Sequence, residues 1–192
     1  MVLEEQRRLL ERAQGIAEPL RRRLYILAVV TKALEAEGWT PIIVGGCALE
    51  LYTFGGYATA DVDVVALDRG RFGQILLQLG FEQEGRYWFR EDLDIVIECP
   101  DEELAGDRKR VLIVEIEGLP CHVIGIEDLI VSRLNGYVFW HVEADREWVK
   151  QLLRHHHADI EWGYLEEQAR MEGTLATLQE LREELADETG GV

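Results

Sequence analysis

The chain has 192 residues, of which 47% are hydrophobic and 30% are charged, a composition typical of a folded globular domain and not of a disordered segment. Its 37 acidic and 20 basic residues give a formal net charge of −17, which argues against nonspecific binding to DNA or to acidic membranes. The longest apolar run, from Leu24 to Val30, is far shorter than the roughly 18 residues of a membrane span. The three cysteines are odd in number and widely spaced, so we expect no disulfide framework and a cytoplasmic location without membrane association.

The first third of the chain predicts helices followed by a strand, a helix and a second strand. Apolar residues recur at spacings of three and four up to Glu37, with Pro19 at the junction of two helices. Gly38 ends this helical region, and the apolar residues 41–44 then predict a short buried strand. The further elements expected here are a helix over 47–54, a strand over 61–67, and a helix that Asp68 caps, that runs to 79 and that Gly80 closes.

Beyond residue 80 the pattern predicts mostly strands and then helices. The strands are expected over 81–90, 93–98, 110–116 and 121–124, and the helices over 127–139, 143–157, 160–172 and 174–186. This order favours an α/β (α+β) fold in which a mixed sheet is flanked by helices. The expected segments are N-terminal helices over 1–37, a core over 38–125 and a helical C-terminal subdomain over 126–192.

Two adjacent glycines form the first candidate site. Gly45 and Gly46 separate the predicted strand 41–44 from the helix that follows it. A turn of this kind exposes backbone N–H groups at the positive end of a helix, where phosphate groups bind. The alternative interpretation is a tight strand-to-helix turn that binds no ligand.

A pair of aspartates in the next strand forms the second candidate site. Asp61 and Asp63 are two residues apart, so the pleat directs both carboxylates to one face of the sheet, while Val62 and Val64 point to the other. Two like charges at this spacing repel each other, and a divalent cation between them removes the repulsion. The pair therefore indicates a metal site.

A third carboxylate is available in the predicted strand 93–98. Asp94 alternates with apolar residues there, with Asp92 and Glu98 as alternatives. Three carboxylates on adjacent strands would hold Mg²⁺ through hard oxygen ligands and leave positions open for triphosphate oxygens and water. Such a site supports in-line attack on a nucleotide phosphorus.

Residues 45–65 read GGCALELYTFGGYATADVDVV and resemble the signature of the nucleotidyltransferase superfamily with the polymerase-beta-like fold. They are similar in particular to small prokaryotic members near the AbiEii toxin and to related uncharacterised groups. Residues 126–134 and 144–148 also look like the helical extension of that group. The resemblance covers about residues 38–172 and implies a nucleotidyltransferase-like sheet with Mg²⁺ as cofactor, two ions being expected when an NTP is bound.

The resemblance also implies roles for single residues. The implied nucleotide-binding residues are Gly45, Gly46, Thr59 and Arg133, and the implied catalytic and metal-binding residues are Asp61, Asp63 and Asp94. Tyr57 stands where members often carry an arginine, and Arg133 stands where they often carry a lysine. Arg133 keeps the positive charge but presents a planar fork to a phosphate. From the residues alone, Thr59 either caps its turn or contacts a phosphate.

We therefore expect an enzyme that moves an NMP group from an NTP to an unidentified hydroxyl on a small molecule, a protein or a tRNA. One alternative is a catalytically silent nucleotide-binding or interaction module. Another is the toxin component of a toxin–antitoxin pair acting on tRNA. A leucine stripe on the last helix packs either on the core or on a second subunit, so a homodimer is a further possibility.

Overall fold

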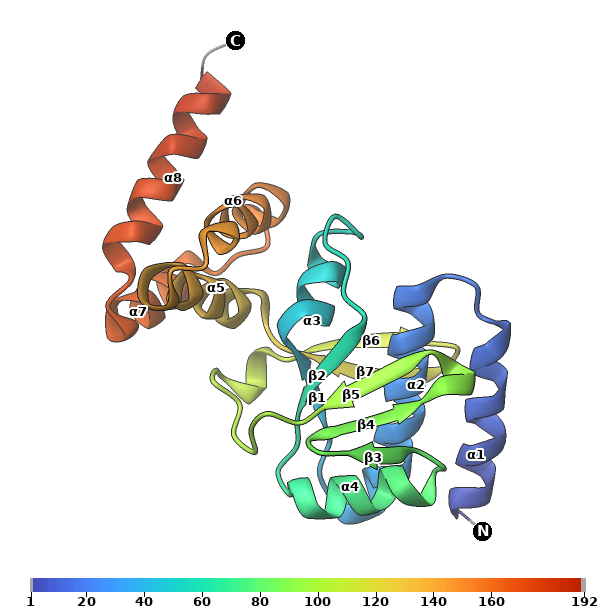
Figure 1. The fold of residues 1–192 in the computed structure, drawn as a ribbon. Helices are drawn as coiled ribbons and strands as arrows, with labels where there is room; N and C mark the ends of the chain where they lie inside the picture. Colours follow the sequence, from blue (N-terminus) through green and yellow to red (C-terminus); the bar gives the residue numbers. More distant parts are fainter. Residues whose placement is uncertain (1, 191–192) are drawn as a thin grey trace. The chain divides into compact units, whose positions relative to one another are not determined.

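The structure, a computed structural model, describes residues 2–190 and divides the chain into two compact units, one up to Ile124 and one from Gly125 onwards. The outermost residues of the expected segments, residue 1 and residues 191–192, lie outside the described part. The two units are coloured blue to yellow and orange to red in Figure 1. Within residues 2–190, no helix combines the length and the apolar character needed to cross a membrane.

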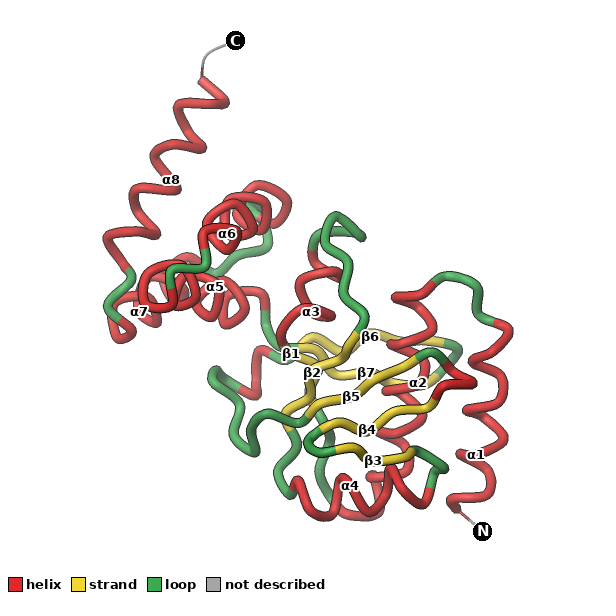
Figure 2. Tube along the Cα trace, viewed as in Figure 1, coloured by secondary structure: helices red, strands yellow, loops and turns green. Residues whose placement is uncertain are grey.

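A seven-stranded mixed sheet forms the centre of the first unit (Figure 2). Its strands are β1 (Ile42–Val44), β2 (Asp61–Val65), β3 (Glu82–Glu84), β4 (Tyr87–Arg90), β5 (Ile95–Glu98), β6 (Leu112–Ile116) and β7 (Leu119–Val123). Their order across the sheet is β3-β4-β5-β2-β1-β7-β6, with β2–β5 and β1–β7 parallel and the other pairs antiparallel. The predicted mixed sheet flanked by helices is therefore confirmed.

Four helices accompany this sheet. They are α1 (Val2–Arg12), α2 (Pro19–Leu34), α3 (Gly45–Tyr52) and α4 (Arg69–Gln78). The carboxylate of Glu18 caps α2 by accepting hydrogen bonds from the backbone N–H groups of Leu20 and Arg21, at 2.8 and 2.6 Å. Most of α2 is buried, and the helix packs against β7 and β6 (Figure 1). As predicted, Asp68 caps α4 by accepting from Arg71 N at 2.8 Å.

The two faces of the sheet differ in character. Trp88 and Ile97 point to the face that carries α4, where Trp88 meets Phe72 edge to face at 5.9 Å between ring centroids. Gly73 allows this approach, because a Cβ there would lie 2.8 Å from the Trp88 ring. The alternate residues, including Asp61 and Asp63 of β2, point to the opposite face and are only partly buried. The polar side chains of the sheet thus gather on one face.

Strands β5 and β6 each begin two residues later than the sequence predicts, and the strand expected over 81–90 is divided into β3 and β4. Residues Glu91–Leu93 form a 3₁₀ turn, and Asp94 ends that turn in the left-handed region with φ +50°. Strand β5 consequently starts at Ile95 and not at residue 93. The hydrophobic alternation of the sequence continues through the turn, so it hides this boundary.

The second unit contains four helices and no strand among its described residues. They are α5 (Ile126–Trp140), α6 (Glu143–His156), α7 (Trp162–Glu172) and α8 (Leu175–Gly190). Leu134, Leu152 and Leu165 are fully buried between them. All four helices were predicted. In the last one Leu178 and Leu181 pack inward and are both 1% exposed, whereas Leu175 and Leu185 are half-buried.

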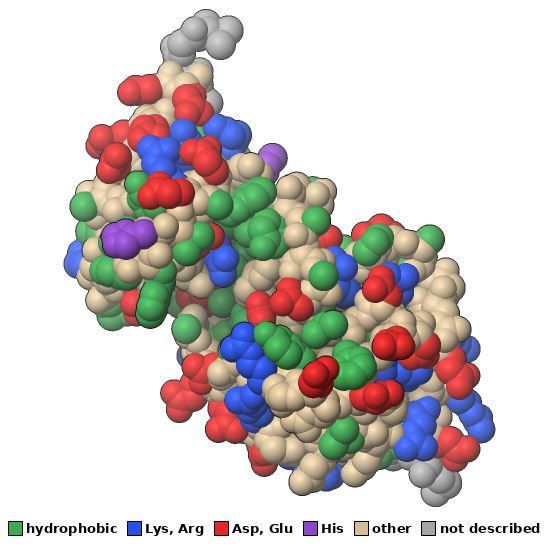
Figure 3. Space-filling model, viewed as in Figure 1, with side chains coloured by type: hydrophobic (Ala, Val, Ile, Leu, Met, Phe, Trp, Pro, Cys, Tyr) green, Lys and Arg blue, Asp and Glu red, His purple; other side chains and the backbone are tan. Residues whose placement is uncertain are grey.

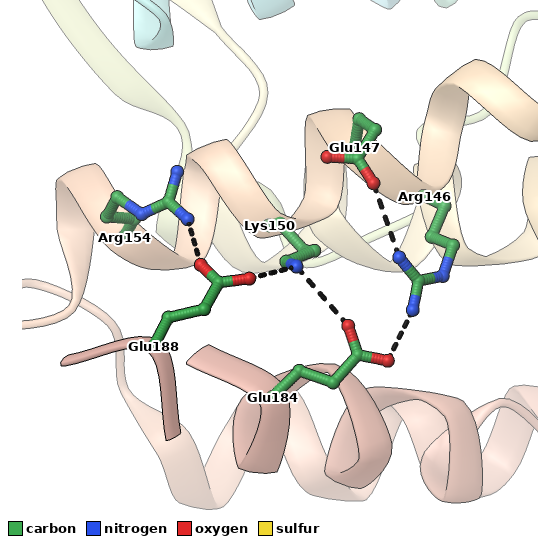
Figure 4. Close-up of polar contacts among 6 residues, drawn as sticks. All are labelled: Arg146, Glu147, Lys150, Arg154, Glu184 and Glu188. Carbon is green, nitrogen blue, oxygen red and sulfur yellow. Dashed lines mark hydrogen bonds and ion pairs between the residues drawn. The ribbon is translucent and has the colours of Figure 1, made fainter. Parts of the chain in front are cut away.

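A ladder of ion pairs joins α6 to α8 (Figure 4). Arg146, Lys150 and Arg154 recur every four residues on α6 and face Glu184 and Glu188 on α8. The Lys150 ammonium lies 2.6 Å from Glu188 and 3.3 Å from Glu184, and Arg154 lies 2.7 Å from Glu188. The acidic character of α8 is thus partly matched by α6. On the face drawn in Figure 3, red and blue side chains are intermixed.

We predict that this ladder contributes a stability that depends on salt and on pH. The hydrogen bond from Lys150 holds the pKa of Glu188 below its ordinary value. A carboxylate with a lowered pKa stabilises the folded state above its unfolded pKa, and this contribution is lost as the pH falls through the folded value. Glu188→Gln should lower the melting temperature at neutral pH by roughly 1 to 3 °C in low salt.

The control is Glu180→Gln, on the same helix outside the ladder, which should leave the melting temperature unchanged. In 1 M salt the Glu188→Gln variant should melt with the wild type, because screening removes the contribution of exposed ion pairs. A difference that persists at high salt would show that Glu188 stabilises α8 by packing and not by charge.

Candidate active site

The first glycine of the predicted pair is held against an aspartate. Strand β1 pairs with β2 so that Val44 lies opposite Asp63, and α3 begins at the next residue. Gly45 has φ +60°, and a Cβ built there would lie 2.1 Å from Asp63 Oδ2. Glycine is therefore required at position 45 both for its backbone conformation and for the space that the carboxylate occupies.

The second glycine is covered by the loop that precedes β2. A Cβ at Gly46 would lie 3.1 Å from the Tyr57 ring and 3.2 Å from the Thr59 side chain. The hydroxyl of Thr53 accepts a hydrogen bond from Tyr57 N at 3.1 Å, which anchors the loop to the end of α3. The glycine pair thus brings α3, β2 and the 57–59 loop into close contact.

The two predicted aspartates share one face of β2. Asp61 and Asp63 are both partly buried, whereas Val62 and Val64 on the other face are fully buried. The Thr59 hydroxyl donates a hydrogen bond to Asp61 Oδ1 at 2.5 Å. Thr59 therefore orients a carboxylate and lies against a glycine at the same time.

A buried ion pair contacts the 57–59 loop. Arg23 of α2 contacts Glu50 of α3, and their side chains are only 7% and 9% exposed. Glu50 Oε2 also accepts a hydrogen bond from Thr59 N at 3.4 Å. Sequence analysis did not identify either residue as part of the site. In the sequence Arg23 is one of three consecutive arginines in α2 and Glu50 is the single charged residue of α3, and neither pattern reveals that the two charges meet.

Burial also decides the state of the cysteine beside the glycines. Cys47 is fully buried, and desolvation raises its pKa to about 12, with Arg23 acting in the opposite direction. The thiol therefore stays protonated at neutral pH, and Cys47 acts as a small packing residue and not as a nucleophile.

The third carboxylate beside the aspartates is that of Glu98. Strand β5 runs parallel to β2 with Asp63 opposite Glu98 and Asp61 opposite Val96, so Glu98 points to the same face as the aspartates. Its side chain is mostly buried, and Arg86 Nε lies 3.2 Å from its Oε1. Glu98, one of the sequence alternatives, therefore stands next to the pair.

The structure does not bring Asp94 to this group. Asp94 has a left-handed backbone conformation and precedes β5, so its side chain does not follow the alternation of that strand. The side chain is 85% exposed, and its Oδ2 lies 2.7 Å from the guanidinium of Arg22 of α2. Asp92, the other alternative, forms an ion pair with Arg90. Both acids thus have arginine partners elsewhere in the first unit.

The donor set can be tested for its fit to a metal ion. Among residues 2–190, no three Asp, Glu, His or Cys side chains are already arranged around one point. Asp61, Asp63 and Glu98 nevertheless lie on adjacent strands and offer the hard oxygen ligands that Mg²⁺ prefers. These residues fit the ion by chemistry and by register, and Glu98 is paired with Arg86 in this structure.

Arg133, the remaining predicted residue, belongs to the second unit. On α5 its guanidinium lies 3.4 Å from Asp145 Oδ1. Asp145 lies against Gly136, where a Cβ would come within 2.0 Å of the carboxylate. Burial raises the pKa of Asp145, and Arg133 counteracts the shift. In this structure Arg133 therefore neutralises a buried acid within its own helical unit.

Comparison with known families identifies the class of protein. The family described as "Nucleotidyltransferase of unknown function (DUF6036)" matches residues 25–185. The chain belongs to this family. The match includes the glycine turn, both aspartates, Glu98 and α5 to α7, so the predicted membership in the nucleotidyltransferases is confirmed. The resemblance to AbiEii-type proteins stays a prediction.

Two solved structures resemble the chain at low sequence identity, and the first of them shares its fold. The crystal structure of an antigenic nucleotidyltransferase-like protein from Paracoccidioides brasiliensis superposes with a TM-score of 0.54 at 16% identity, covering 72% of this chain and 77% of that chain. The solution structure of the antibiotic-resistance factor ANT(2'')-Ia gives a TM-score of 0.45 at 17% identity, with coverages of 85% and 94%. No curated protein matches the chain.

We predict that removing one partner of the buried ion pair destabilises the first unit. Glu50→Ala leaves the Arg23 charge buried without its counterion, which should cost roughly 3 to 5 kcal/mol in urea unfolding. Glu4→Ala, which breaks an exposed pair with Arg8, is the control and should cost less than about 1 kcal/mol. If Arg23→Met with Glu50→Leu is as unstable as Glu50→Ala, the uncompensated charge is not the cause.

A second prediction concerns the contact between Gly45 and Asp63. Gly55→Ala provides the matched control, because Gly55 has φ +82° with open space around its Cβ position. Backbone strain should cost each variant about 1 to 2 kcal/mol. Gly45→Ala should lose roughly a further 1 to 3 kcal/mol from the clash with the carboxylate. Equal losses in urea unfolding would contradict the role given to Asp63.

Proposed function

We propose that the protein transfers an NMP group from an NTP to a hydroxyl acceptor with the help of Mg²⁺. The observation that carries the proposal is the register of β2 and β5, which sets Glu98 beside Asp63 at the glycine turn that begins α3. Family membership supports nucleotidyl transfer in general. The metal, the residue roles and the acceptor are our own assignment.

The carboxylates of Asp61, Asp63 and Glu98 are the residues that would hold Mg²⁺, with two ions when an NTP is bound. Bound Mg²⁺ supplies positive charge that stabilises the pentavalent phosphorus and the departing pyrophosphate. Thr59 fixes the orientation of Asp61 through its hydroxyl, so this ligand is positioned before the substrate arrives.

The start of α3 is suited to the triphosphate. Val44 precedes the helix and has no side-chain group that could cap it, while Asp63 Oδ2 lies against Gly45, so a phosphate would share the N–H groups of the first turn with this carboxylate. Gly45 and Gly46 add no side chains at this end of the helix. We assign the phosphates of the NTP to this turn.

The transfer step needs a base for the acceptor. The acceptor oxygen attacks the α-phosphorus and forms a new P–O bond, while the bond between that phosphorus and the bridging oxygen breaks and pyrophosphate leaves. The hydroxyl proton passes to the carboxylate of Glu98, which lies at the edge of the group nearest β4. The role of Arg133, on α5 of the second unit, stays an implication of the family resemblance, and no part of this step is assigned to it.

A catalytically silent nucleotide-binding module is the second candidate. The ion pair between Arg86 and Glu98 favours it, because the arginine already neutralises the proposed base. This candidate predicts Mg²⁺-dependent NTP binding without pyrophosphate release over a broad panel of acceptors.

We predict that transfer depends on Glu98 and not on Asp94. With labelled NTP, Mg²⁺ and an acceptor panel, Asp61→Asn and Asp63→Asn should abolish transfer, and Glu98→Gln should reduce it roughly 100-fold or more. Asp94→Asn is the control and should keep wild-type transfer, because this carboxylate contacts Arg22.

Thermal denaturation should show that all four variants remain folded. Loss of transfer in Asp94→Asn together with full transfer in Glu98→Gln would overturn the assignment of the third carboxylate. Full transfer in Asp61→Asn and Asp63→Asn would overturn the proposed function itself.

A further inference from the structure

A pocket of about 640 Å³ opens on the sheet face that carries the carboxylates. It is lined by Glu84, Gly85, Arg86, Tyr87, Phe89 and Val96, all from the first unit. Its floor is largely apolar, although it opens beside charged residues. No role for this pocket follows from family membership.

The floor of the pocket continues the face of the proposed site. On β4, Trp88 points to the buried face, so its neighbours Tyr87 and Phe89 point to the open one. Pairing of β4 with β5 places Tyr87 opposite Glu98 and Phe89 opposite Val96. Tyr87 therefore lies directly beyond Glu98 in the row of Asp63, and Phe89 lies beyond Val96 in the row of Asp61.

The order of the strands places the pocket on one side of the proposed metal site, with the glycine turn on the other side. The glycine turn lies at β1 and β2, Glu98 follows on β5, and the pocket lies on β4 beyond it. In-line displacement requires the attacking hydroxyl to approach opposite the leaving pyrophosphate. This argument rests on the proposed function: with the phosphates at the glycine turn, the acceptor approaches from the side of β4.

We propose that this pocket is the acceptor site and that it takes a flat, ring-bearing alcohol without negative charge. Tyr87, Phe89 and Val96 offer an apolar surface on which a planar ring can stack. The Arg86 guanidinium already lies over the Tyr87 ring at 5.0 Å, which shows that this ring face accepts a planar, positively charged group. Glu84, Glu98 and Arg86 together leave one excess negative charge at the pocket, which disfavours an anion such as an RNA end.

Arg86 covers the base until the acceptor binds. Its guanidinium donates to the Tyr87 hydroxyl at 2.8 Å, and its Nε lies 3.2 Å from Glu98. A ring that stacks on Tyr87 takes the place of this guanidinium and thereby frees the Glu98 carboxylate. Binding of the acceptor and exposure of the base are thus coupled through one side chain.

The test uses tyramine, a cationic phenol, as a probe in saturation-transfer NMR with the full chain and without NTP or metal. Tyr87→Ala and Phe89→Ala should each reduce the probe signal at least fivefold, whereas Tyr87→Phe, which keeps the ring, should retain it. Trp140→Ala, which removes an exposed aromatic ring of the second unit, is the control and should bind like the wild type. Arg86→Ala should strengthen the signal, because the competing guanidinium is gone.

Three results would overturn the proposal. One is an unchanged tyramine signal in Tyr87→Ala and Phe89→Ala, once circular dichroism shows both variants folded. Another is Tyr87-dependent binding of phenyl phosphate or of a short single-stranded RNA that is stronger than that of tyramine. The third is a weaker signal in Arg86→Ala.

The same variants separate this proposal from the proposed function. Asp61→Asn should abolish NMP transfer and leave tyramine binding intact. If tyramine binding depends on Tyr87 but the protein transfers NMP to no acceptor, the proposed enzymatic function is wrong and the pocket is a binding site for a ring only. If NMP transfer proceeds with unchanged kcat/KM in both Tyr87→Ala and Phe89→Ala, the proposal of the acceptor site is wrong and the proposed enzymatic function still stands.

Discussion

The buried ion pair between Arg23 and Glu50 is the interaction on which the candidate site depends. It joins α2 to α3, and Glu50 also accepts a hydrogen bond from the backbone of Thr59. Two charges removed from water stabilise a fold only when they meet each other, and here Glu50 is satisfied by Arg23 and Thr59, whereas Arg23 Nε is buried without a hydrogen-bond partner. One glutamate thus fixes two helices and the loop before β2, and through the Thr59 hydroxyl it also sets the position of Asp61.

The glycine turn is shaped by this protein's own carboxylate as much as by any ligand. Antiparallel pairing of β1 and β2 brings Asp63 to the first residue of α3, where a side chain at position 45 would occupy the carboxylate's space. A negative charge at the start of a helix is also favourable, because the helix dipole is positive there. The proposed metal ligand and the proposed phosphate turn are therefore parts of one packed unit, which is a reason to expect them to act together.

The acidic residues behind the net charge of −17 have different surroundings in the two units. In the helical unit Glu184 and Glu188 of α8 face the basic stripe of α6, so these two charges are neutralised within the unit. On the sheet face the acids lie close together, and Arg86 is the cation that contacts Glu98. The excess of acid around this face suits a metal ion and an acceptor without negative charge better than a nucleic acid.

The local pattern of the sequence determined the helices, the strands, the glycine turn and the shared face of Asp61 and Asp63, because these depend on spacing between near neighbours. It also carried enough of the family signature to indicate a nucleotidyltransferase. It did not distinguish Asp94 from Glu98, since the alternation of apolar and acidic residues is the same for both. It also did not predict the ion pair between Arg23 and Glu50 or the contact of Arg86 with Glu98. Those depend on the parallel register of β2 and β5, on a left-handed turn at residue 94 and on helix packing. Only the tertiary structure decides them, because each joins residues that are far apart in the chain.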